Sequence, residues 1–421
     1  MSRLDLVIFG ATGFTGKQAV IHMVQYAHKY NLTWAVAGRS EKKLQEVMLE
    51  VSQKAGEDVS SIKLIVADVK DDESLNSMCA QCKVLVNCCG PYRLYGKPVV
   101  KAAIQNKTHY VDVSGEPQFM ETMQLVYNEQ ARDAGVYVIS ACGWDSLPAD
   151  VGVVYLLKNF TGVCNSVESY VSSHLPPQVA AAAGARGSVN YGTWESLVYG
   201  LAYSNELPAL RKKLYPNRLP SFVPKLKRKI LHKKDGKWCV PFPGADESVV
   251  YRTQRHRHDT EQKRPVQLKA YFKIGGLIQA MLTVFAAIAL FAMSKTKFTR
   301  KLLLDYPRVF SFGAITREGP SDDVMKNKSF KFELVGRGWA REEDVHTTKP
   351  DKTVVVEVSG TNPAYGATVV ALLMSAITIL REKEKMPTSG GVITPGTAFT
   401  NTDIVNNLTA NDLKFEVVDA K

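Results

Sequence analysis

The first third of the chain alternates short apolar runs with segments whose apolar residues recur at helical spacing. Residues 4–9 are apolar and β-prone, and a glycine turn separates them from a helical pattern over 17–28. Further apolar runs predict strands at 33–37, 62–67, 83–88, 109–113 and 136–140. Strands that alternate with helices predict a parallel, doubly wound sheet with right-handed crossovers. We therefore expect an α/β fold whose residues 1–150 form a Rossmann-type domain.

The pattern changes after Asp150, where the segments become longer. Strand-like runs lie at 163–173, 329–335 and 353–359, and the last of them leads into a predicted helix over 366–381. A chain of 421 residues also exceeds the size at which one hydrophobic core keeps growing. These features predict a second domain of α+β type over residues 151–389.

Residues 274–293 form a stretch of 20 residues without a charge, with Lys273 before it and several basic residues after it. A helix of this length can span a bilayer. A single span is excluded, however, if the strands near 163 and 329 belong to one sheet. The segment would then be a monotopic anchor or re-entrant hairpin with its basic flanks at lipid headgroups. The alternative is a buried helix at an oligomer interface.

The net charge of +12 is concentrated, because 11 Lys or Arg residues lie between Arg211 and Lys237 with Asp235 as the only acid. This cluster favours an anionic partner, although a solvated basic loop has the same composition. Lipid headgroups fit better than nucleic acid, since no nucleic-acid-binding module is recognisable and an apolar segment follows. Seven scattered cysteines and the lack of a secretory signal predict a reduced, cytosolic protein that is not secreted.

The glycine turn after the first strand follows a strand and opens a helix, as a dinucleotide site does, with the looser spacing Gly-x-x-Gly-x-x-Gly in place of Gly-x-Gly-x-x-Gly. Gly10 permits the tight turn, Gly13 lets the backbone approach a pyrophosphate, and Gly16 allows the helix to pack close to the sheet. The helix N-terminus then offers free N–H groups and a positive dipole to the phosphates. A purely structural turn is the alternative. The other turn residues expected at this site are Thr12, Phe14 and Thr15.

The residues after the second strand indicate which dinucleotide binds. An NAD-selective site places an acidic residue there, whereas this chain has Arg39 and Ser40, followed by two lysines. A guanidinium beside a hydroxyl suits the 2′-phosphate, so we expect NADP(H) rather than NAD(H). Asp68, at the end of the third strand, could contact the adenine. The nicotinamide end is expected to meet the segment that contains Cys89, Gly90 and Pro91.

Four cysteines at positions 79, 82, 88 and 89 invite a zinc interpretation, but a strand separates the two pairs by about 20 Å. No tetrahedral site spans that distance, so we expect no metal and interpret the four as core thiols. Acid–base candidates at the carboxyl ends of strands are Tyr92, Asp112, Glu116 and Asp145. Each has a structural alternative in helix capping or packing. Chemistry alone therefore does not identify a proton donor.

Five motifs together resemble the saccharopine dehydrogenase-like oxidoreductases of animals. They are Gly-Ala-Thr-Gly-Phe-Thr-Gly from Gly10, Val-Ala-Gly-Arg-Ser ending at Ser40, Asn-Cys-Cys-Gly-Pro-Tyr from Asn87, Tyr-Val-Asp-Val-Ser-Gly-Glu-Pro from Tyr110, and Gly-Trp-Asp-Ser-Leu-Pro-Ala-Asp from Gly143. The resemblance continues through Gly-Thr-Trp at Gly192 and Gly-Gly-Val-Ile-Thr-Pro-Gly at Gly390. Enzymes that form saccharopine carry Asp-Pro-Gly near Asp145, and this departure argues against saccharopine itself as the substrate.

The resemblance implies a Rossmann domain completed by residues 390–421 and an inserted α+β domain that carries the substrate side and homo-oligomer contacts. It also implies association with the cytosolic face of a membrane or lipid droplet. Tyr191 and Thr193, together with Tyr92 and Asp145, are the catalytic candidates. A similarity to bacterial enoyl reductases makes a lipidic enoyl or acyl substrate, or an imine, plausible. The alternative is a non-catalytic scaffold or redox sensor that binds a dinucleotide.

Overall fold

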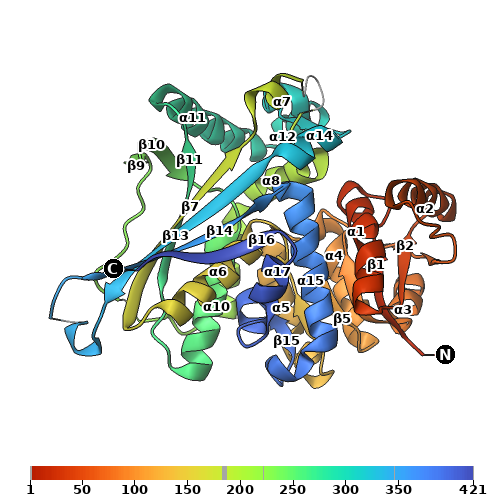
Figure 1. The fold of residues 1–421 in the computed structure, drawn as a ribbon, viewed down its shortest axis with the longest axis horizontal. Coiled ribbons are helices and arrows are strands. Elements are labelled where there is room, and N and C mark those ends of the chain that lie inside the picture. Colours follow the sequence, from red (N-terminus) through yellow and green to blue (C-terminus); the bar gives the residue numbers. More distant parts are fainter. Residues whose placement is uncertain (1, 183–186, 221, 346, 421) are drawn as a thin grey trace. The chain divides into compact units, whose positions relative to one another are not determined.

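The computed structural model describes residues 2–182, 187–220, 222–345 and 347–420. The chain divides into two compact units, each built around its own sheet (Figure 1). The first unit contains Met1–Gly143 and Ala364–Ile404, and the second contains Trp144–Pro363 and Val405–Lys421. The chain thus leaves the first unit a few residues before the boundary expected at 150, and it returns well before 390.

The sheet of the first unit has seven parallel strands in the order β15-β6-β5-β4-β1-β2-β3. The strands are β1 (Leu4–Phe9), β2 (Trp34–Gly38), β3 (Lys63–Val66), β4 (Cys82–Asn87), β5 (His109–Asp112), β6 (Tyr137–Ile139) and β15 (Gly391–Ile393). Each apolar run predicted between 4 and 140 overlaps one of these strands. The chain reverses direction across the sheet between β1 and β4, which is where doubly wound sheets bind dinucleotides.

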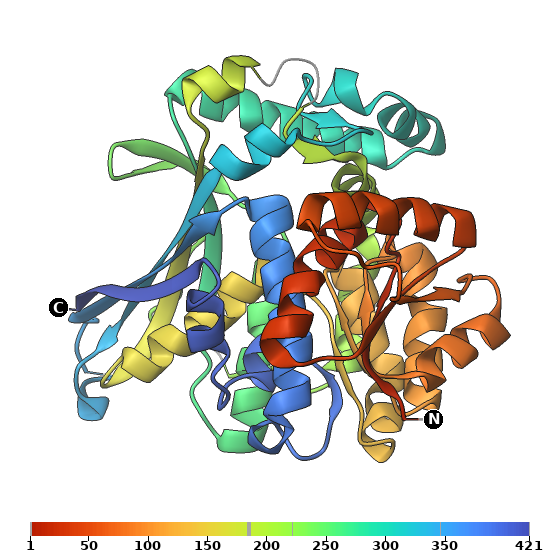
Figure 2. The same cartoon turned by 45° about the vertical axis from the view of Figure 1, so that its right-hand side comes forward.

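Helices cover this parallel sheet because its strands are apolar on both faces. They are α1 (Phe14–Tyr30), α2 (Glu41–Ala55), α3 (Asp72–Ala80), α4 (Tyr92–Gln105), α5 (Pro117–Asp133), α15 (Thr368–Arg381) and α16 (Pro395–Ala398). In Figure 2, α1 and α15 run side by side although they are far apart in sequence. The sequence pattern assigns α15 to the second domain, and this assignment is wrong. The helix is buried over nearly its whole length and packs on β4 and β5, which places it in the first unit.

The sheet of the second unit is mixed, with seven strands in the order β16-β14-β13-β7-β11-β10-β9. The strands are β7 (Val163–His174), β9 (His232–Lys234), β10 (Lys237–Pro241), β11 (Gln267–Ile274), β13 (Ser329–Trp339), β14 (Lys352–Thr361) and β16 (Leu413–Ala420). Strand β16 pairs with β14, so the last residues complete this sheet. Of the segment 390–421, β15 pairs with the first sheet and β16 with the second.

Helices α6 (Ser146–Asn159) and α10 (Asp246–Glu261) pack on the sheet of the second unit. The remaining elements of this unit are α7 (Pro177–Ala182), β8 (Val189–Asn190), α8 (Tyr191–Ala202), α9 (Leu207–Leu214), α11 (Leu277–Ser294), α12 (Lys297–Asp305), α13 (Pro307–Phe310), β12 (Ile315–Thr316) and α14 (Asp322–Asn327). A short helix, α17 (Ile404–Thr409), precedes β16.

The apolar segment predicted at 274–293 begins as the last residue of a strand. Ile274 ends β11, two glycines turn the chain, and the helix starts at Leu277. Strands β7 and β13 are direct antiparallel neighbours, so a single membrane span between them is excluded. In the described part of the chain, two helical stretches are long and apolar enough to cross a membrane: 277–294, which is 11% buried, and 363–381, which is 83% buried. The second is a core helix of the first unit, whereas the first exposes its apolar face.

Candidate functional site

The glycine turn of the first unit is held by backbone contacts that leave no room for side chains. Gly10 has a φ of +82°, and a Cβ on it would lie 3.0 Å from the backbone of Cys88 and Cys89. A Cβ on Gly16 would lie 2.1 Å from the carbonyl oxygen of Gly10. Glycine is therefore required at both positions, once for its backbone angle and once for the close approach of helix and turn.

The N-terminus of α1 is left open to a ligand. Gly13 is its N-cap, no side chain caps the first turn, and no acidic residue lies there. By contrast, Ser40 caps α2 through the Lys43 N–H, and the Asp71 carboxylate caps α3. The uncapped N–H groups and the helix dipole of α1 suit a pyrophosphate. The expected turn residues lie around this end: Thr12 and Gly13 are exposed, and Phe14 and Thr15 are half-buried.

The ends of β2, β3 and β4 bring three predicted cofactor residues close together. Burial raises the pKa of the Cys89 thiol, the nearby charge of Arg39 lowers it and that of Asp68 raises it further, so both charges lie close to this thiol. Arg39 itself is exposed. The described residues place no carboxylate directly after β2, so a 2′-phosphate would meet a cation rather than an acid there.

The segment after β4 is anchored by buried hydrogen bonds. Asn87 accepts from the Cys89 N–H through its side-chain oxygen at 2.9 Å and donates to the Tyr110 hydroxyl at 2.9 Å. The Glu116 carboxylate accepts from the N–H groups of Tyr92 and Arg93, both at 2.9 Å, and thereby caps α4. Gly90 and Pro91 are held between these two anchors. Glu116, one of the acid–base candidates, therefore has a structural task in this structure.

Two further acid–base candidates of the first unit, Tyr92 and Asp112, take part in buried hydrogen bonds. The Tyr92 hydroxyl donates to the carbonyl oxygen of Asn87 at 2.9 Å, and burial raises the pKa of Tyr92 well above its usual value. The Asp112 carboxylate accepts from the hydroxyls of Tyr110 and Ser140, both at 2.9 Å, and from two backbone N–H groups. Burial raises the pKa of Asp112 to about 6 in spite of these donors. A proton donor in this unit would have to break an existing hydrogen bond.

Asp145 lies in the second unit beside a carboxyl group that no sequence pattern marks. Its side chain caps α6 by accepting from the Ser146 N–H at 2.8 Å. Burial raises the pKa of Asp145. Asp246, at the start of α10, is fully buried, and neither of its carboxylate oxygens has a hydrogen-bond partner among the described residues. Burial and the nearby charge of Asp145 raise the pKa of Asp246 well above its usual value. A pair of this kind can hold a proton at neutral pH.

Tyr191 and Thr193 lie in the first turn of α8, which the Asn190 side chain caps. The Arg317 guanidinium lies 4.3 Å from the centre of the Tyr191 ring. Thr193 is exposed. The Tyr191 ring also belongs to an apolar cluster that includes Leu290 and Met293 of α11. The substrate candidates on α8 are therefore packed directly against the exposed apolar helix.

The basic stretch between 211 and 237 is partly neutralised by the second sheet. Lys229 pairs with Glu168, Arg228 with Glu247, and Lys234 with Glu333. Other basic residues of the stretch have no ion-pair or hydrogen-bond partner for their side chains among the described residues: Lys212, Lys213, Arg218, Lys225, Lys227 and Lys237. Only part of the predicted positive charge is thus free for a partner.

The four cysteines considered for zinc separate into two environments. Cys79 and Cys82 are buried, and burial raises the pKa of Cys79 to about 12. Cys88 and Cys89 are half-buried just after β4, so the interpretation as core thiols applies only to the first pair. No group of three or more potential metal ligands occurs among the described residues.

Tyr365 is a site residue that sequence reasoning missed. It lies in the turn that leads into α15, is 3% exposed, and places its ring centre 4.4 Å from that of Phe14. It therefore supports the glycine turn from more than 300 residues away in the sequence. Nothing local marks a tyrosine after a strand as a cofactor-loop residue, so no pattern could have identified it.

Comparison with known proteins agrees with this geometry. Residues 6–139 match the family model of the saccharopine dehydrogenase NADP binding domain. A lipid droplet localized protein of Caenorhabditis elegans is 40% identical, with 99% of each chain covered. The saccharopine dehydrogenase-like oxidoreductase of Homo sapiens is 37% identical over 98% of this chain and 97% of that protein. Apo saccharopine dehydrogenase (L-Glu forming) of Saccharomyces cerevisiae has a TM-score of 0.54 at 17% identity, covering 99% of this chain and 100% of that one.

The solved structure shares only the fold with this chain, because its sequence identity is low. The two curated relatives share sequence over nearly their whole length, including the glycine turn and both units. The chain therefore belongs to the family of saccharopine dehydrogenase-like oxidoreductases.

Proposed function

We propose that this chain is an NADP(H)-dependent oxidoreductase that works at the cytosolic surface of a lipid droplet or membrane. The observation that carries the cofactor part is the uncapped N-terminus of α1, together with Arg39 and Asp68 near the Cys89 thiol. An exposed guanidinium at the end of β2 attracts the charged 2′-phosphate of NADP(H), whereas the uncharged ribose hydroxyls of NAD(H) give it no ion pair. The matched family model, which is an NADP binding domain, supports the same choice.

The test of the cofactor is a titration of the purified protein with NADPH and NADH side by side. We expect tighter binding of NADPH, and we expect the Arg39→Asp variant to lose this preference. Lys63→Glu, a charge reversal at an exposed position of β3 distant from the carboxyl end of that strand, is the matched control. Binding of neither dinucleotide would contradict the proposal and would leave the glycine turn with a structural role only.

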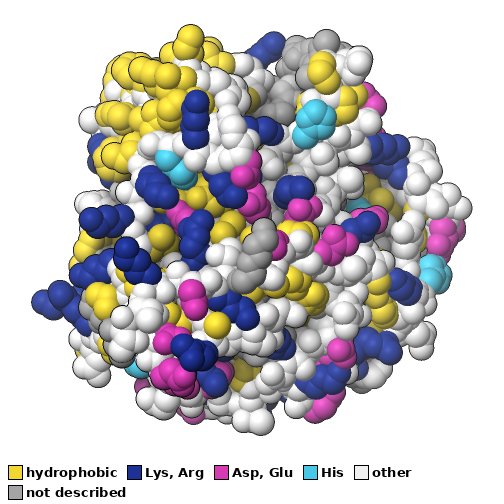
Figure 3. Space-filling view, turned by 60° about the vertical axis from the view of Figure 1, so that its left-hand side comes forward, with side chains coloured by type: hydrophobic (Ala, Val, Ile, Leu, Met, Phe, Trp, Pro, Cys, Tyr) yellow, Lys and Arg dark blue, Asp and Glu magenta, His cyan; other side chains and the backbone are white. Residues whose placement is uncertain are grey.

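The surface part of the proposal rests on one face of α11. Its exposed side chains recur at helical spacing, and several expose more than half of their area: Ile278 (76%), Met281 (57%), Leu282 (62%), Phe285 (72%) and Ile288 (62%). The opposite face packs into the unit through Ala280 and Val284. Figure 3 shows a continuous hydrophobic area on this side of the second unit, with Lys and Arg side chains next to it. We call the five exposed side chains the apolar face of α11.

A lipid surface is the occupant that best fits the apolar face of α11. Further exposed apolar residues follow on α12, α13 and the next turn, namely Phe298 (73%), Val309 (67%) and Phe312 (90%). Each large side chain that enters the lipid contributes about 1.5–3 kcal/mol. The C. elegans relative is named a lipid droplet localized protein, which supports this occupant. A second copy of the chain is the competing occupant.

The test of the surface compares Phe285→Glu with Leu49→Glu, which changes an exposed apolar residue of α2 that is 66% exposed. We expect the first variant to lose binding to lipid droplets and phospholipid vesicles, and the control to keep it. Deletion of 274–293 with unchanged cofractionation would overturn the proposal. A monomer produced from an oligomer by Phe285→Glu, without any change in lipid binding, would assign the face to a second copy.

We infer that the substrate is lipidic, of enoyl or acyl type, or an imine. Its support is the packing of α8, which carries Tyr191 and Thr193, against α11. A substrate taken from lipid would then meet this helix first. Asp145, with Asp246 beside it, is the proposed proton donor, because the Tyr92 hydroxyl is already engaged. A panel of enoyl, carbonyl and imine lipids tests turnover.

The competing function is a scaffold or redox sensor that binds the dinucleotide without turnover. The observation in its favour is that the acid–base candidates of the first unit all serve hydrogen bonds of the fold. The two functions differ in one measurement. NADPH binding without hydride transfer to any member of the panel would favour the scaffold, whereas turnover that Asp145→Asn abolishes without loss of NADPH binding would favour the enzyme.

A further inference from the structure

The second unit contains a cavity of about 650 Å³ that none of the functions above uses. It lies where β7, β13 and β14 meet the beginning of β16. Even-numbered residues of β13 such as Leu334 and Gly336 contact α6, so Lys331 and its odd-numbered neighbours point to the opposite face of the sheet. The cavity is therefore on the side of the sheet away from α6.

The strand register aligns hydrogen-bond donors into two rows in this cavity. In the first row, Lys331 lies opposite Ser359 on one side and Ser172 on the other, and Ser359 lies opposite Lys414. In the second row, Ser329 lies between Thr361 and His174. Residues two apart on a strand share a face, so the two rows form one surface that spans four strands.

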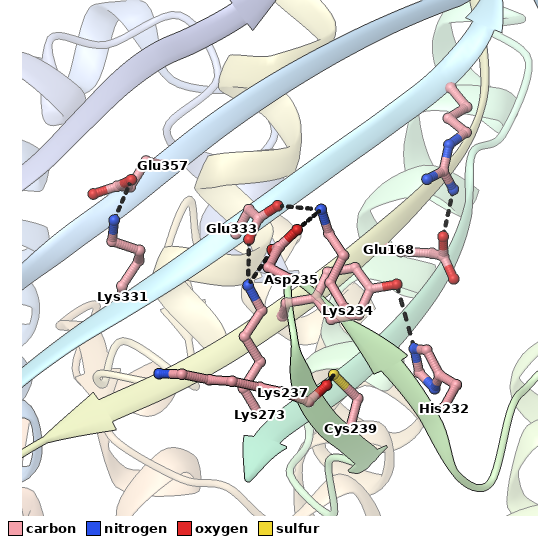
Figure 4. Close-up of polar contacts among 12 residues, drawn as sticks. Glu168, His232, Lys234, Asp235, Lys237, Cys239, Lys273, Lys331, Glu333 and Glu357 are labelled. Carbon is pink, nitrogen blue, oxygen red and sulfur yellow. Dashed lines mark hydrogen bonds and ion pairs between the residues drawn. The ribbon is translucent and has the colours of Figure 1, made fainter. Parts of the chain in front are cut away.

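The cations of this cavity are only partly satisfied. Lys331 pairs with Glu357 at 2.7 Å. Lys237 and Lys414 have no ion-pair or side-chain hydrogen-bond partner within the residues that the structure describes. Figure 4 shows the Lys237 side chain lying apart from the bonded group formed by Lys234, Lys273, Asp235 and Glu333. Two lysines of the cavity thus have no ion-pair partner among the described residues.

The hydroxyl groups of the cavity are also available. Four of them belong to the two rows, and none makes a side-chain hydrogen bond to another described residue: Ser172, Ser329, Ser359 and Thr361. Asp412 is the single carboxylate in the lining. Three lysines and a histidine face it, so donors and positive charge dominate.

We propose that this cavity binds a phosphate group, either free or as a phosphate monoester. A phosphate offers three acceptor oxygens and close to two negative charges, which matches several hydroxyl donors and unpaired lysines better than a single carboxylate does. Lysine acts here as a point charge and the hydroxyls supply direction. The volume of this open cavity lies within the range of small-molecule sites, so it has room for more than the phosphate itself.

The experiment measures binding of inorganic phosphate and of glycerol 3-phosphate by calorimetry, on full-length protein saturated with NADPH. Saturation masks the phosphate site at α1, and the separate NADPH titration reveals any failure of that first site. We compare wild type with Lys237→Gln, Lys414→Gln and Ser359→Ala. Lys63→Gln serves as the control for loss of one exposed positive charge on a strand. Thermal unfolding of each variant verifies that it is folded.

We expect each lysine variant to weaken binding about tenfold or more, Ser359→Ala to weaken it less, and Lys63→Gln to leave it unchanged. A second arm uses vesicles with and without phosphatidic acid. Binding of the soluble phosphates indicates a soluble ligand. If the soluble phosphates do not bind, stronger binding to vesicles with phosphatidic acid than to vesicles without it, again weakened by Lys414→Gln, indicates a lipid headgroup as the source. No phosphate binding in either arm, or binding that the lysine variants leave unchanged, would overturn the proposal. Dissociation of an oligomer by Lys414→Gln without phosphate binding would equally overturn it.

Discussion

Replacement of Gly16 by alanine tests how the glycine turn holds the first unit together. The new Cβ would lie 2.1 Å from the carbonyl oxygen and 2.8 Å from the carbonyl carbon of Gly10. Both are backbone atoms, so no side chain can rotate away. The Gly10 carbonyl is itself tied to the turn, because it accepts from the Gly13 N–H at 3.0 Å. Helix α1 must therefore move as a whole.

The cost of this movement follows from what α1 buries. Ala19, Val20 and Met23 are fully buried on its inner face. Overpacking a core contact costs about 1–3 kcal/mol, and a backbone clash of this depth belongs at the upper end. Alanine has a higher helix propensity than glycine, and this difference stabilises α1 by about 1 kcal/mol. We expect a net loss of about 2 kcal/mol in the free energy of unfolding, which lowers Tm by about 4–8 °C for a unit of this size.

Gly13→Ala separates binding from folding. Its Cβ would meet only the Gly10 carbonyl oxygen, at 3.3 Å, and the position is exposed. We expect a small change in Tm and a loss of NADPH affinity of tenfold or more, about 1.4 kcal/mol, because the methyl group occupies the path of the pyrophosphate. Gly200→Ala on α8 is the control, since no atom lies within 4 Å of its added Cβ. An unchanged Tm for Gly16→Ala would refute the reasoning, as would unchanged NADPH affinity for Gly13→Ala.

Three further predictions concern buried carboxyl groups. The pKa of Asp246 is raised in the folded protein, because its charged form is disfavoured there. The stability of the protein is therefore highest below about pH 4, the pKa of the group in the unfolded chain, and it is lost as pH rises through the folded pKa. Asp246→Asn is therefore expected to be more stable than wild type at pH 8 in denaturant unfolding, and a less stable variant would contradict this. The pKa of Asp112 is raised to about 6, which costs about 3 kcal/mol of stability between pH 4 and 7, and carbon NMR of its carboxyl group should show a midpoint near that value. Glu116→Ala removes two charge-assisted hydrogen bonds that cap α4 and should lower the free energy of unfolding by about 2 kcal/mol. The amide N–H groups of Cys89 and its neighbours should then exchange faster with solvent. An unchanged free energy of unfolding would exclude the capping role.

Local pattern was sufficient for residues 4–140 of the first unit. Its strands are short apolar runs bounded by turns, and its helices have regular apolar spacing, so each element is visible without its neighbours. The site residues follow from position alone, because parallel strands place their carboxyl ends at one edge. The pattern of the sequence is therefore enough to predict that Gly10, Arg39, Asp68 and Cys89 lie at this edge of the sheet.

Local pattern does not predict all the strands of the second unit. Strands β10, β11 and β16 mix charged and apolar residues, and their lysines are neutralised only by acids from distant strands, as Lys273 is by Glu333. Ile274 belongs to a strand although it begins an uncharged stretch, because the turn at Gly275 and Gly276 divides that stretch. Hydropathy averaged over a window of residues does not show where a strand ends and a helix begins within an uncharged stretch.

The sequence by itself determined the Rossmann sheet, its glycine turn, its acid-free end of β2 and the presence of a long apolar segment, because these depend on residues close together in the chain. Only the tertiary structure decided where α15 and β16 pack, that Tyr365 supports Phe14, and that Asp246 lies beside Asp145. It also decided that the apolar segment cannot span a membrane, since β7 and β13 pair directly. These contacts join residues far apart in the chain, and their free energy comes from burial and pairing that no local pattern encodes.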